Sequence, residues 1–391
     1  GDVYKRQSCC SAPDHCLRKF RGIVTMFALP YAASGRGERH LVKQKGKRRQ
    51  SGAPTIADVA KHAGVSPMTV SRVINDESNV RDSTRKNVLA SIDALGYSPN
   101  QAARSLAGAD QIRIGLLYDR PDTSYVSTFL VSGLRQTSRR NVQLVVKRSD
   151  TAGDACEAID RLAVSGIDGI ILPPPVSDWP SVIRKVEELD LPTVLAATAR
   201  PHTNCSVVGI DDYAAAREIV GHLARLGHKR IGFITGHPAQ EASERRLAGY
   251  RDELTRHGLP VDELLIAGGR FTYRSGLDAA TTLLDNPDPP TAIFASNDEM
   301  AAATIAVAYR RGIDVPGDLS VCGFDDTYLA RTVWPELTTI HQPIEEIAQV
   351  AVDHIIDKIR ARRDGERAGR KRIVLSHTLV RRESDAQLID D

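Results

Sequence analysis

The segment TIADVAKHAGVSPMTVSRVIN, residues 55–75, leaves four side chains without apolar neighbours. They are Met68, Thr69, Ser71 and Arg72. The apolar residues of this segment recur at helical spacing in two short runs, 56–63 and 70–74, which account for the inner faces of two helices. The four remaining side chains offer a guanidinium, two hydroxyls and an apolar tip. These are groups that contact phosphates and base edges in nucleic acids.

The residues around them place these groups on the second of the two helices. Thr55 and Asp58 form a capping-box pair, and Gly64 suits the left-handed end of the first helix. Ser66 caps the second helix, and Pro67 takes its first position. Helix, tight turn and helix is the arrangement that lays a second helix in the DNA major groove. An ordinary three-helix bundle with a polar face is the alternative.

A third helix is predicted over about residues 82–95, and Gly96 is expected to end it. Its inner face is expected to carry Val88, Leu89, Ile92 and Leu95. This helix would close a small core over the other two.

Charge divides the chain of 391 residues into a basic front and an acidic body. Residues 1–110 hold 18 Lys and Arg against 9 Asp and Glu, whereas residues 111–391 hold 34 against 40. A basic front is expected to meet a polyanion. The length is too great for one ordinary core, so two or three domains are expected.

The first 50 residues are interpreted as a non-native or disordered basic tail. GDVYKRQ resembles translated adaptor sequence, and Met26 can serve as the true start. The run from Arg18 to Gly35 mimics a signal peptide, but Pro30 interrupts its apolar part. No apolar run reaches the roughly 18 residues needed to cross a membrane. Six cysteines without a C-x-x-C pair indicate neither a zinc knuckle nor a disulfide framework, so a cytoplasmic protein is expected.

Three phrases in order resemble the lactose-repressor/galactose-repressor (LacI/GalR) family of bacterial transcription factors. They are the segment above, then VRDSTRKNV, then GYSPNQAARSLAG, and the resemblance continues to about residue 382. The resemblance implies a small all-α helix-turn-helix domain over residues 54–98 and a hinge helix over 99–109. A two-lobed α/β domain with parallel sheets, similar to periplasmic sugar-binding proteins, would follow over 111–382, with a tail over 383–391.

In the second helix the resemblance places Pro67, Met68 and Arg72 at base-reading positions. Arg72 can donate two hydrogen bonds to guanine, whereas the other two side chains can read only by apolar contact. Phosphate contacts, which position the domain without specifying a sequence, are expected from Thr55, Thr69, Ser71 and Asn75.

The hinge phrase begins at Asn100. Relatives order this segment into a short helix on DNA, where two such helices pack together in the minor groove. Ala103 is small enough for that close approach, and Leu106 matches the leucine that wedges into the central base step. A core leucine on an amphipathic linker is the alternative for Leu106.

From Ile112 onward, short apolar strands alternate with amphipathic helices in two successive series. This alternation predicts two α/β lobes with a ligand crevice at the carboxyl ends of the strands. The expected strands cover residues 113–119, 142–148, 168–175, 192–198 and 206–211 in the first lobe, and 230–236, 263–269, 292–298 and 319–326 in the second.

Polar residues at these strand ends are the ligand candidates. Arg246 is expected to open the helix after RIGFITG, and Asn297 and Asp325 follow later strands. A guanidinium, an amide and a carboxylate in one cleft suit a polyhydroxylated ligand such as a sugar, and Tyr125 and Phe271 can stack on its apolar faces. The neighbouring Asp298 and Asp326 are expected to cap helices instead.

One departure concerns Ala197, because many relatives carry a carboxylate near this position that contacts a ligand hydroxyl. Relatives bind sugars, nucleosides or purines, and a sugar is the ligand expected here. After Val380 only RRESDAQLIDD remains, which is too short and polar for the leucine-heptad helix of tetrameric relatives. A homodimer on a pseudo-palindromic DNA operator is therefore expected.

Two other classes of protein remain as alternatives. A solute-binding protein would suit residues 112–382 equally well, but residues 55–108 and the lack of a convincing export signal argue against it. An enzyme such as a sugar kinase or dehydrogenase would need a motif that is missing, since there is no P-loop, G-x-S-x-G or H-E-x-x-H. His222 and His228 lack a metal-ligand partner set. The sequence thus predicts a ligand-controlled repressor with no catalytic residue, cofactor or metal.

Overall fold

The computed structural model describes residues 54–74, 80–97, 111–119, 123–198, 205–366 and 369–388. The chain divides into two units between residues 99 and 100. The predicted tail over residues 1–50, together with Asn75, Asn100, Ala103 and Leu106, lies outside the described residues.

The smaller unit contains three helices, α1 (Ile56–Ala63), α2 (Pro67–Ile74) and α3 (Asp82–Ala94). Thr55 and Asp58 form both hydrogen bonds of a capping box, and Gly64 ends α1 with a φ of 67°. The Ser66 hydroxyl accepts a hydrogen bond of 3.1 Å from the backbone N–H of Thr69. These contacts confirm the helix starts and the tight turn predicted from the sequence.

The core of this unit takes one fully buried valine from each helix, Val59, Val70 and Val88. The prediction for α3 was wrong at Leu89, which is 51% exposed. Val88, Ile92 and Leu95 follow each other at helical spacing on one face, whereas Leu89 lies about 100° further round the helix from Val88. The third helix therefore has a narrower inner face than its apolar residues suggested.

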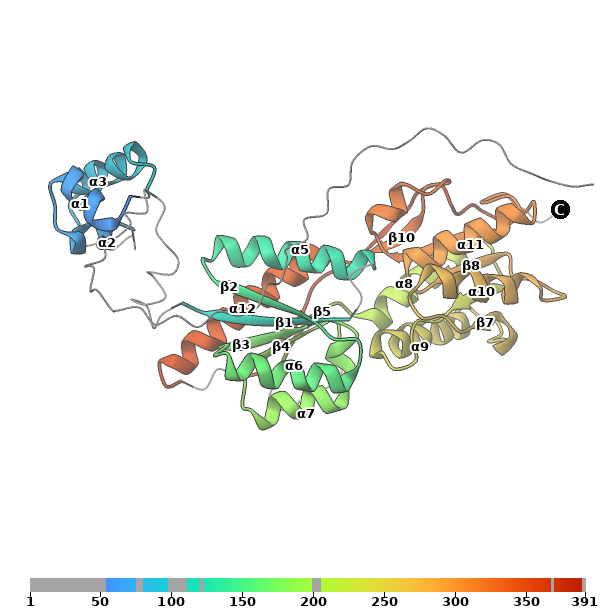
Figure 1. Ribbon diagram of the computed structural model, residues 1–391. Coiled ribbons are helices and arrows are strands. Elements are labelled where there is room, and N and C mark those ends of the chain that lie inside the picture. The colour runs from blue at the N-terminus through green and yellow to red at the C-terminus, as the bar shows by residue number, and fades with distance from the viewer. Residues whose placement is uncertain are drawn as a thin grey trace, which may run out of the picture. The chain divides into compact units, whose positions relative to one another are not determined.

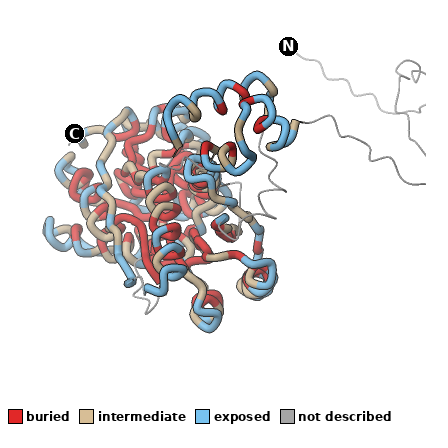
Figure 2. The backbone as a smooth tube through the Cα atoms, turned by 90° about the vertical axis from the view of Figure 1, so that its left-hand side faces the viewer, coloured by how far each residue is buried: buried red, intermediate tan, exposed pale blue. Residues whose placement is uncertain are grey.

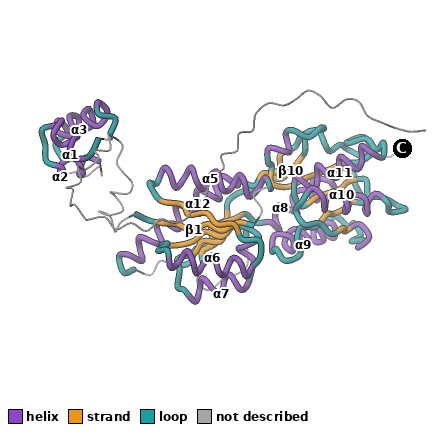
Figure 3. Tube along the Cα trace, viewed as in Figure 1, coloured by secondary structure: helices purple, strands orange, loops and turns teal. Residues whose placement is uncertain are grey.

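The larger unit contains two six-stranded sheets, one in each lobe (Figure 3). The first consists of β1 (Arg113–Tyr118), β2 (Gln143–Arg148), β3 (Gly169–Leu172), β4 (Thr193–Ala196), β5 (Ser206–Gly209) and β11 (Arg372–Val374), in the order β11-β5-β4-β3-β1-β2. The second consists of β6 (Ile231–Ile234), β7 (Ile266–Ala267), β8 (Ala292–Ala295), β9 (Ser320–Asp325), β10 (Thr338–His341) and β12 (Thr378–Val380), in the order β12-β10-β9-β8-β6-β7. Every pairing is parallel except that of β12 with β10.

Helices cover both faces of each sheet (Figure 1). The first lobe has α5 (Ser124–Arg139) and α12 (Ile344–Arg363) on one face, and α6 (Ala152–Val164) and α7 (Pro180–Glu188) on the other. The second lobe has one packed pair of α8 (Asp212–Arg225) and α9 (Glu241–Arg256), and another of α10 (Tyr273–Leu284) and α11 (Asp298–Arg310). Short 3-10 turns occupy η1 (Val176–Asp178), η2 (Glu263–Leu265) and η3 (Tyr328–Arg331). Buried positions, red in Figure 2, gather inside this unit, as expected for sheets covered on both faces.

The chain crosses between the lobes three times. It leaves the first sheet after β5 and enters α8, returns after β10 into α12, and leaves again between β11 and β12. The crossing segments are residues 210–211, 342–343 and 375–377. The sequence pattern had not predicted β10, β11, β12 or α12, so the composition of each lobe is a finding of the structure.

The last described residues belong to the second lobe. Ser384, in the predicted tail, is fully buried and donates to the carbonyl of Val321. Asp385 accepts hydrogen bonds from His222 and Thr338, and His228 contacts Thr291 and Ser320. Both histidines are thus packing residues of the lobe. Among the described helices, none is long and apolar enough to cross a membrane.

Candidate functional site

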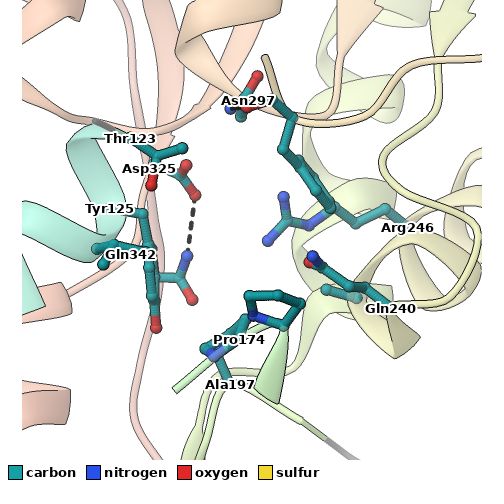
Figure 4. A pocket seen from close by; sticks show the side chains of 13 residues that line it. Thr123, Tyr125, Pro174, Ala197, Gln240, Arg246, Asn297, Asp325 and Gln342 are labelled. Atoms are coloured by element: carbon teal, nitrogen blue, oxygen red, sulfur yellow. Dashed lines mark hydrogen bonds between the residues drawn. The ribbon is translucent and has the colours of Figure 1, made fainter. Parts of the chain in front are cut away.

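A pocket opens between the two lobes, at the carboxyl ends of the strands (Figure 4). Its lining comes from the start of α5, the ends of β3, β4, β8 and β9, the loop after β7, the start of α9 and the crossing after β10. The lining residues are Thr123, Tyr125, Val126, Pro174, Pro175, Ala197, Gln240, Ala242, Arg246, Phe271, Asn297, Asp325 and Gln342. The structure therefore brings the five predicted ligand residues, Tyr125, Arg246, Phe271, Asn297 and Asp325, into one pocket.

The two walls of the pocket differ in chemistry. The first lobe contributes apolar groups after its strands, Pro174, Pro175 and Ala197, and two hydroxyl-bearing residues at the start of α5, Thr123 and Tyr125. The second lobe contributes the amides, the guanidinium and the carboxylate, which point towards the same space in Figure 4. A ligand that fits this pocket needs hydrogen-bonding groups towards the second lobe and towards Tyr125, and a less polar face against the prolines and Ala197.

Arg246 anchors the polar wall. The residue is 4% exposed, and both Nε and Nη2 lie 2.8 Å from Oδ1 of Asp212. The guanidinium also donates to the carbonyl of Ser296 and lies 3.5 Å from the ring centroid of Phe324. Arg246 lies in the second turn of α9, so the prediction that it opens this helix was wrong. The helix begins earlier, at Glu241, and the guanidinium reaches the pocket from its side.

Asp325 ends strand β9 and is 6% exposed. Its Oδ1 accepts a hydrogen bond of 2.9 Å from the side-chain amide of Gln342. Burial raises the pKa of Asp325 well above its ordinary value, and the positive charge of Arg246 opposes that rise. The backbone φ of Asp325 is 106°, an unusual value for a residue with a side chain. This strained backbone holds the carboxyl group at the pocket.

Two buried polar atoms of the pocket have no hydrogen-bond partner among the described residues. They are the hydroxyl of Tyr125 and Oε1 of Gln342. A buried hydroxyl or amide oxygen without a partner costs about 1–3 kcal/mol, and natural proteins rarely leave such atoms unpaired. A ligand that offers a donor and an acceptor here would satisfy both atoms.

Phe271 reaches the pocket from the loop after β7, with a φ of 57°. A Cβ atom at Gly236 would lie 2.0 Å from the edge of its ring, so only glycine leaves room for this placement. The guanidinium of Arg246 lies 5.6 Å from the centre of the same ring. The ring is therefore fixed by packing and can offer a flat apolar surface to a ligand.

Asn297 has a structural role as well as a place in the pocket. Its side-chain oxygen caps α11 by accepting from the backbone N–H of Met300, and its nitrogen donates to the carbonyl of Phe271. The cap therefore also holds the loop that carries Phe271.

Asp298 and Asp326 do not cap helices, contrary to prediction. Asp298 accepts hydrogen bonds from the hydroxyls of Thr327 and Thr339. Burial raises its pKa to about 7, although these hydrogen bonds oppose the rise. Asp326 pairs instead with Arg382, at 2.5 Å. Both carboxyl groups hold strands and loops together within the second lobe.

Sequence reasoning missed several pocket residues, including Gln240 and Gln342. Gln342 directly follows β10, a four-residue strand with no helix pattern before it, and lies in a crossing between the lobes. A prediction of the strand TTIH (residues 338–341) would have placed Gln342 at a strand end and so among the ligand candidates. Ala197, singled out as a departure, does line the pocket, with a φ of 50°. The first-lobe wall therefore has no carboxylate at this point.

In the smaller unit, the described side chains that are predicted to contact DNA belong to α2 or to the cap of α1. Met68 is 63% exposed and Arg72 is exposed, whereas Thr69 and Ser71 are half-buried. Pro67 and Thr55 are also exposed, at the first position of α2 and at the cap of α1. The described face offers one guanidinium, several hydroxyls and an apolar tip, as the sequence indicated. Its base-reading and phosphate roles remain predictions.

The described residues contain no candidate metal site. Among the described residues, no group of three or more His, Cys, Asp or Glu side chains could hold a metal ion.

Comparison with known proteins assigns the two units. The family model of bacterial regulatory proteins, lacI family, matches residues 55–100, and that of the periplasmic binding protein-like domain matches residues 220–384. Catabolite control protein A of Priestia megaterium is 38% identical over 307 residues, which cover 76% of this chain and 90% of that protein. The chain belongs to the lacI family.

Solved structures of lacI-family members share this architecture. A complex of the transcriptional regulator CelR with cellobiose is 31% identical and has a TM-score of 0.64, over 85% of this chain and 99% of that one. A lac repressor dimer bound to operator and the anti-inducer ONPF is 27% identical and has a TM-score of 0.70, with the same coverage. This lacI-family protein is thus a DNA-binding transcriptional regulator, and the relatives it matches are regulators rather than enzymes.

The unpaired hydroxyl of Tyr125 gives a test of the pocket. Tyr125→Phe should leave the unfolding midpoint unchanged or raise it, because the removed hydroxyl has no partner to lose. Tyr250→Phe is the matched control, since the Tyr250 hydroxyl is buried and donates to the carbonyl of Ile231 at 2.7 Å. That change should cost about 1 kcal/mol. Thermal unfolding of the two variants measures the difference, and an equal loss in both would mean that Tyr125 has a structural partner.

Proposed function

We propose that this lacI-family regulator is a repressor that binds a pseudo-palindromic operator as a homodimer, and that a sugar bound between its lobes controls operator affinity. The proposal of a ligand rests on the pocket between the lobes, where two buried polar atoms, Tyr125 Oη and Gln342 Oε1, have no hydrogen-bond partner among the described residues. A sugar fits this chemistry because each hydroxyl both donates and accepts. The similar regulator CelR has been crystallised with cellobiose.

The sugar would lie with its hydroxyls on the second-lobe wall. Asp325 would accept from two hydroxyls, and Arg246 and Asn297 would hydrogen-bond to others. Phe271 and Tyr125 would stack on the less polar face of the ring. On the first-lobe wall, Ala197 stands in place of a carboxylate beside Pro174 and Pro175, and the hydroxyl of Tyr125 offers a polar contact to the sugar.

Ligand binding would act through the lobes. A ligand that touches both walls favours the arrangement in which the walls are close, and it shifts the population of lobe arrangements by its difference in affinity for them. Ser124 of the first lobe donates to Glu299 of the second at 2.8 Å, so a direct contact between lobes already borders the pocket. Release of DNA by an inducer and tightening by a corepressor both follow from this scheme.

On DNA, the second helix of the smaller unit would lie in the major groove. Arg72 would donate two hydrogen bonds to a guanine, with Pro67 and Met68 in apolar contact with neighbouring bases. Thr55, Thr69 and Ser71 would contact phosphates. The predicted roles of Asn75, Asn100, Ala103 and Leu106 complete this interface and rest on the sequence alone. We also infer that the protein acts in the cytoplasm, where bacterial DNA lies, and has no enzymatic activity.

A second copy of the chain would bind through the second lobe. Three side chains there form what we call the aromatic surface, Tyr309, Tyr328 and Trp334, which are 83%, 83% and 78% exposed. Tyr309 and Trp334 line one groove between α11 and the segment after η3. Exposed apolar side chains that line one groove, as Tyr309 and Trp334 do, are typical of protein interfaces, and a two-fold dimer matches a palindromic operator. The similar lac repressor structure is a dimer on its operator.

Arg72→Ala tests the base-reading role. It should weaken binding to the preferred operator by about 1–3 kcal/mol and relax the preference at one base pair, because a bidentate contact to guanine is lost. Selection from a randomised duplex library, before and after the change, measures the preference at each position. Lys86→Ala, at an exposed position of α3, is the control and should leave the base preference at every position unchanged. If the Arg72 variant kept all preferences, the assignment would be wrong.

Asp325→Asn tests the sugar site while preserving the shape of the side chain. Sugar affinity should fall about 10- to 100-fold, because the amide nitrogen of asparagine cannot accept hydrogen bonds from sugar hydroxyls, and leaving buried polar groups unpaired costs about 1–3 kcal/mol. Operator affinity without sugar should stay the same. Calorimetry with a panel of mono- and disaccharides, followed by operator titration with the tightest sugar, measures both. Asp278→Asn, exposed on α10, is the control. Equal sugar affinity in the Asp325 variant and wild type would contradict the site.

Trp334→Glu combined with Tyr309→Glu tests the dimer. Two carboxylates placed on the aromatic surface should produce a monomer in sedimentation equilibrium, because their charge would have to be buried on association. Operator affinity should fall when the dimer is lost, since one protomer reaches only one half-site. Val164→Glu is the matched control, at an exposed valine of the first lobe (90% exposed). A dimer that survived the double change would exclude this surface.

A further inference from the structure

One stretch of the ligand-binding unit is basic, although the unit as a whole has more acidic than basic residues. Residues 360–372 contain seven Arg or Lys and two acidic residues, within a unit (residues 111–391) that holds 34 basic and 40 acidic residues. We call the six described basic residues the basic edge: Arg360, Arg362, Arg363, Arg370, Lys371 and Arg372. All six are exposed.

The basic edge lies where the polypeptide enters the first lobe. The carboxylate of Asp168 shows that the end of α12 lies beside the start of β1. It accepts a hydrogen bond from the backbone N–H of Arg113 at 2.8 Å and another from Nη2 of Arg363 at 2.9 Å. Arg113 begins β1, the first strand after the smaller unit. Strand β11, which begins at Arg372, belongs to the same parallel sheet, so its start lies at the same edge as the start of β1. Figure 1 shows the end of α12 and the start of β1 at the same end of the lobe.

Part of this charge has an ordinary structural explanation. Cations in the last turn of a helix interact favourably with its dipole, which accounts for basic residues at the end of α12. Arg362 pairs with Asp190 at 3.1 Å, and Arg363 pairs with Asp168. The dipole does not account for Lys371 and Arg372 at the start of a strand. Within the described part of the chain, these two and Arg360 form no ion pair.

We propose that the basic edge binds the phosphates of DNA that flanks the operator. This inference rests on the proposed operator binding and extends it to a second contact made by the ligand-binding unit. Between Tyr97 and Gln111 the chain has only residues 98–110, which can extend to at most about 45 Å. The edge at which the chain enters the lobe is therefore tethered near the duplex whenever the smaller unit is bound. Lys and Arg held there would meet phosphates at high effective concentration.

The contact has a consequence for regulation. The basic edge includes the end of α12, and α12 begins at the crossing that carries the pocket residue Gln342. The helix packs on β3, β4 and β5 and so moves with the first lobe. A change in the lobes on sugar binding would therefore alter the phosphate contacts of the flanks as well as those of the operator.

The test compares two full-length variants with wild type on two duplexes. The edge variant carries Arg360→Gln, Lys371→Gln and Arg372→Gln. The control carries Arg225→Gln, Lys229→Gln and Arg256→Gln, which remove three exposed basic residues from the second lobe. One duplex of about 20 base pairs covers two half-sites one helical turn apart, and another of about 50 base pairs adds flanks on both sides. Both contain the sequence that wild-type protein selects from a random library. Circular dichroism and sugar affinity check that each variant is folded.

On the long duplex, the edge variant should bind about 10-fold or more weakly at 0.1 M salt, and its plot of log affinity against log salt should be less steep. Each lost phosphate contact lowers that slope by about 0.9, so a dimer should lose up to about 5. On the short duplex it should match wild type, and the control should match wild type on both.

Unchanged affinity and slope on the long duplex would overturn the proposal and leave an acidic protein as the partner of the edge. An equal loss on both duplexes would also overturn it, because the effect would then not arise in the flanks. If wild-type protein selected no duplex at all, operator binding itself would fail, which is a different outcome from either of these.

Discussion

A buried guanidinium must be paired, and the pairing of Arg246 organises the second lobe around the pocket. Its partner Asp212 begins α8, directly after the first crossing between the lobes. Burial raises the pKa of Asp212, and the charge of Arg246 opposes that rise. The same guanidinium donates to the carbonyl that follows β8 and lies over a ring of β9. One side chain thus ties α8, α9, β8 and β9 together at the pocket wall. Removing it would leave a buried carboxylate unpaired, at a cost of about 3–5 kcal/mol.

The three crossings set how the lobes can influence each other. Each crossing is two or three residues long, so the lobes are joined by short segments rather than by a flexible linker. The crossing at residues 342–343 contributes Gln342, which donates to Asp325 across the pocket edge. A ligand that changes this contact therefore acts directly on a segment that joins the lobes. Helix α12 continues from that segment along the first lobe. The geometry links ligand contact to the far edge of the lobe through one helix.

Two kinds of recognition are divided between the two units. The smaller unit has a core of small aliphatic side chains and leaves the polar side of α2 exposed. The larger unit buries its sheets on both faces, and two of its buried polar atoms that have no hydrogen-bond partner among the described residues, Tyr125 Oη and Gln342 Oε1, lie at the pocket. The aromatic surface lies on the second lobe and the basic edge on the first. The surfaces proposed for a second copy and for DNA flanks therefore do not overlap, so one dimer can use both.

Local signals were sufficient for the starts of α1 and α2 and for five of the thirteen residues that line the pocket. The capping box at Thr55, the left-handed Gly64 and the proline at the start of α2 act within a few residues, so their outcome does not depend on the rest of the chain. The same holds for ligand residues at strand ends, because the carboxyl ends of parallel strands must meet at one edge of a sheet. That rule placed Asn297 and Asp325 correctly in the pocket.

Other features depend on contacts between residues far apart in the sequence. Strands β11 and β12 have three residues each, too few to show a period, and exist because β5 and β10 supply their hydrogen bonds. Leu89 is exposed because the other two helices cover only one side of α3. Asp298 and Asp326 took partners from the following loop, β10 and residue 382 instead of capping helices. Gln342 entered the pocket only because the chain crosses between the lobes there. The sequence alone determined which local groups were available, and the tertiary structure decided which buried polar groups they would pair with, because that pairing depends on the whole packed environment.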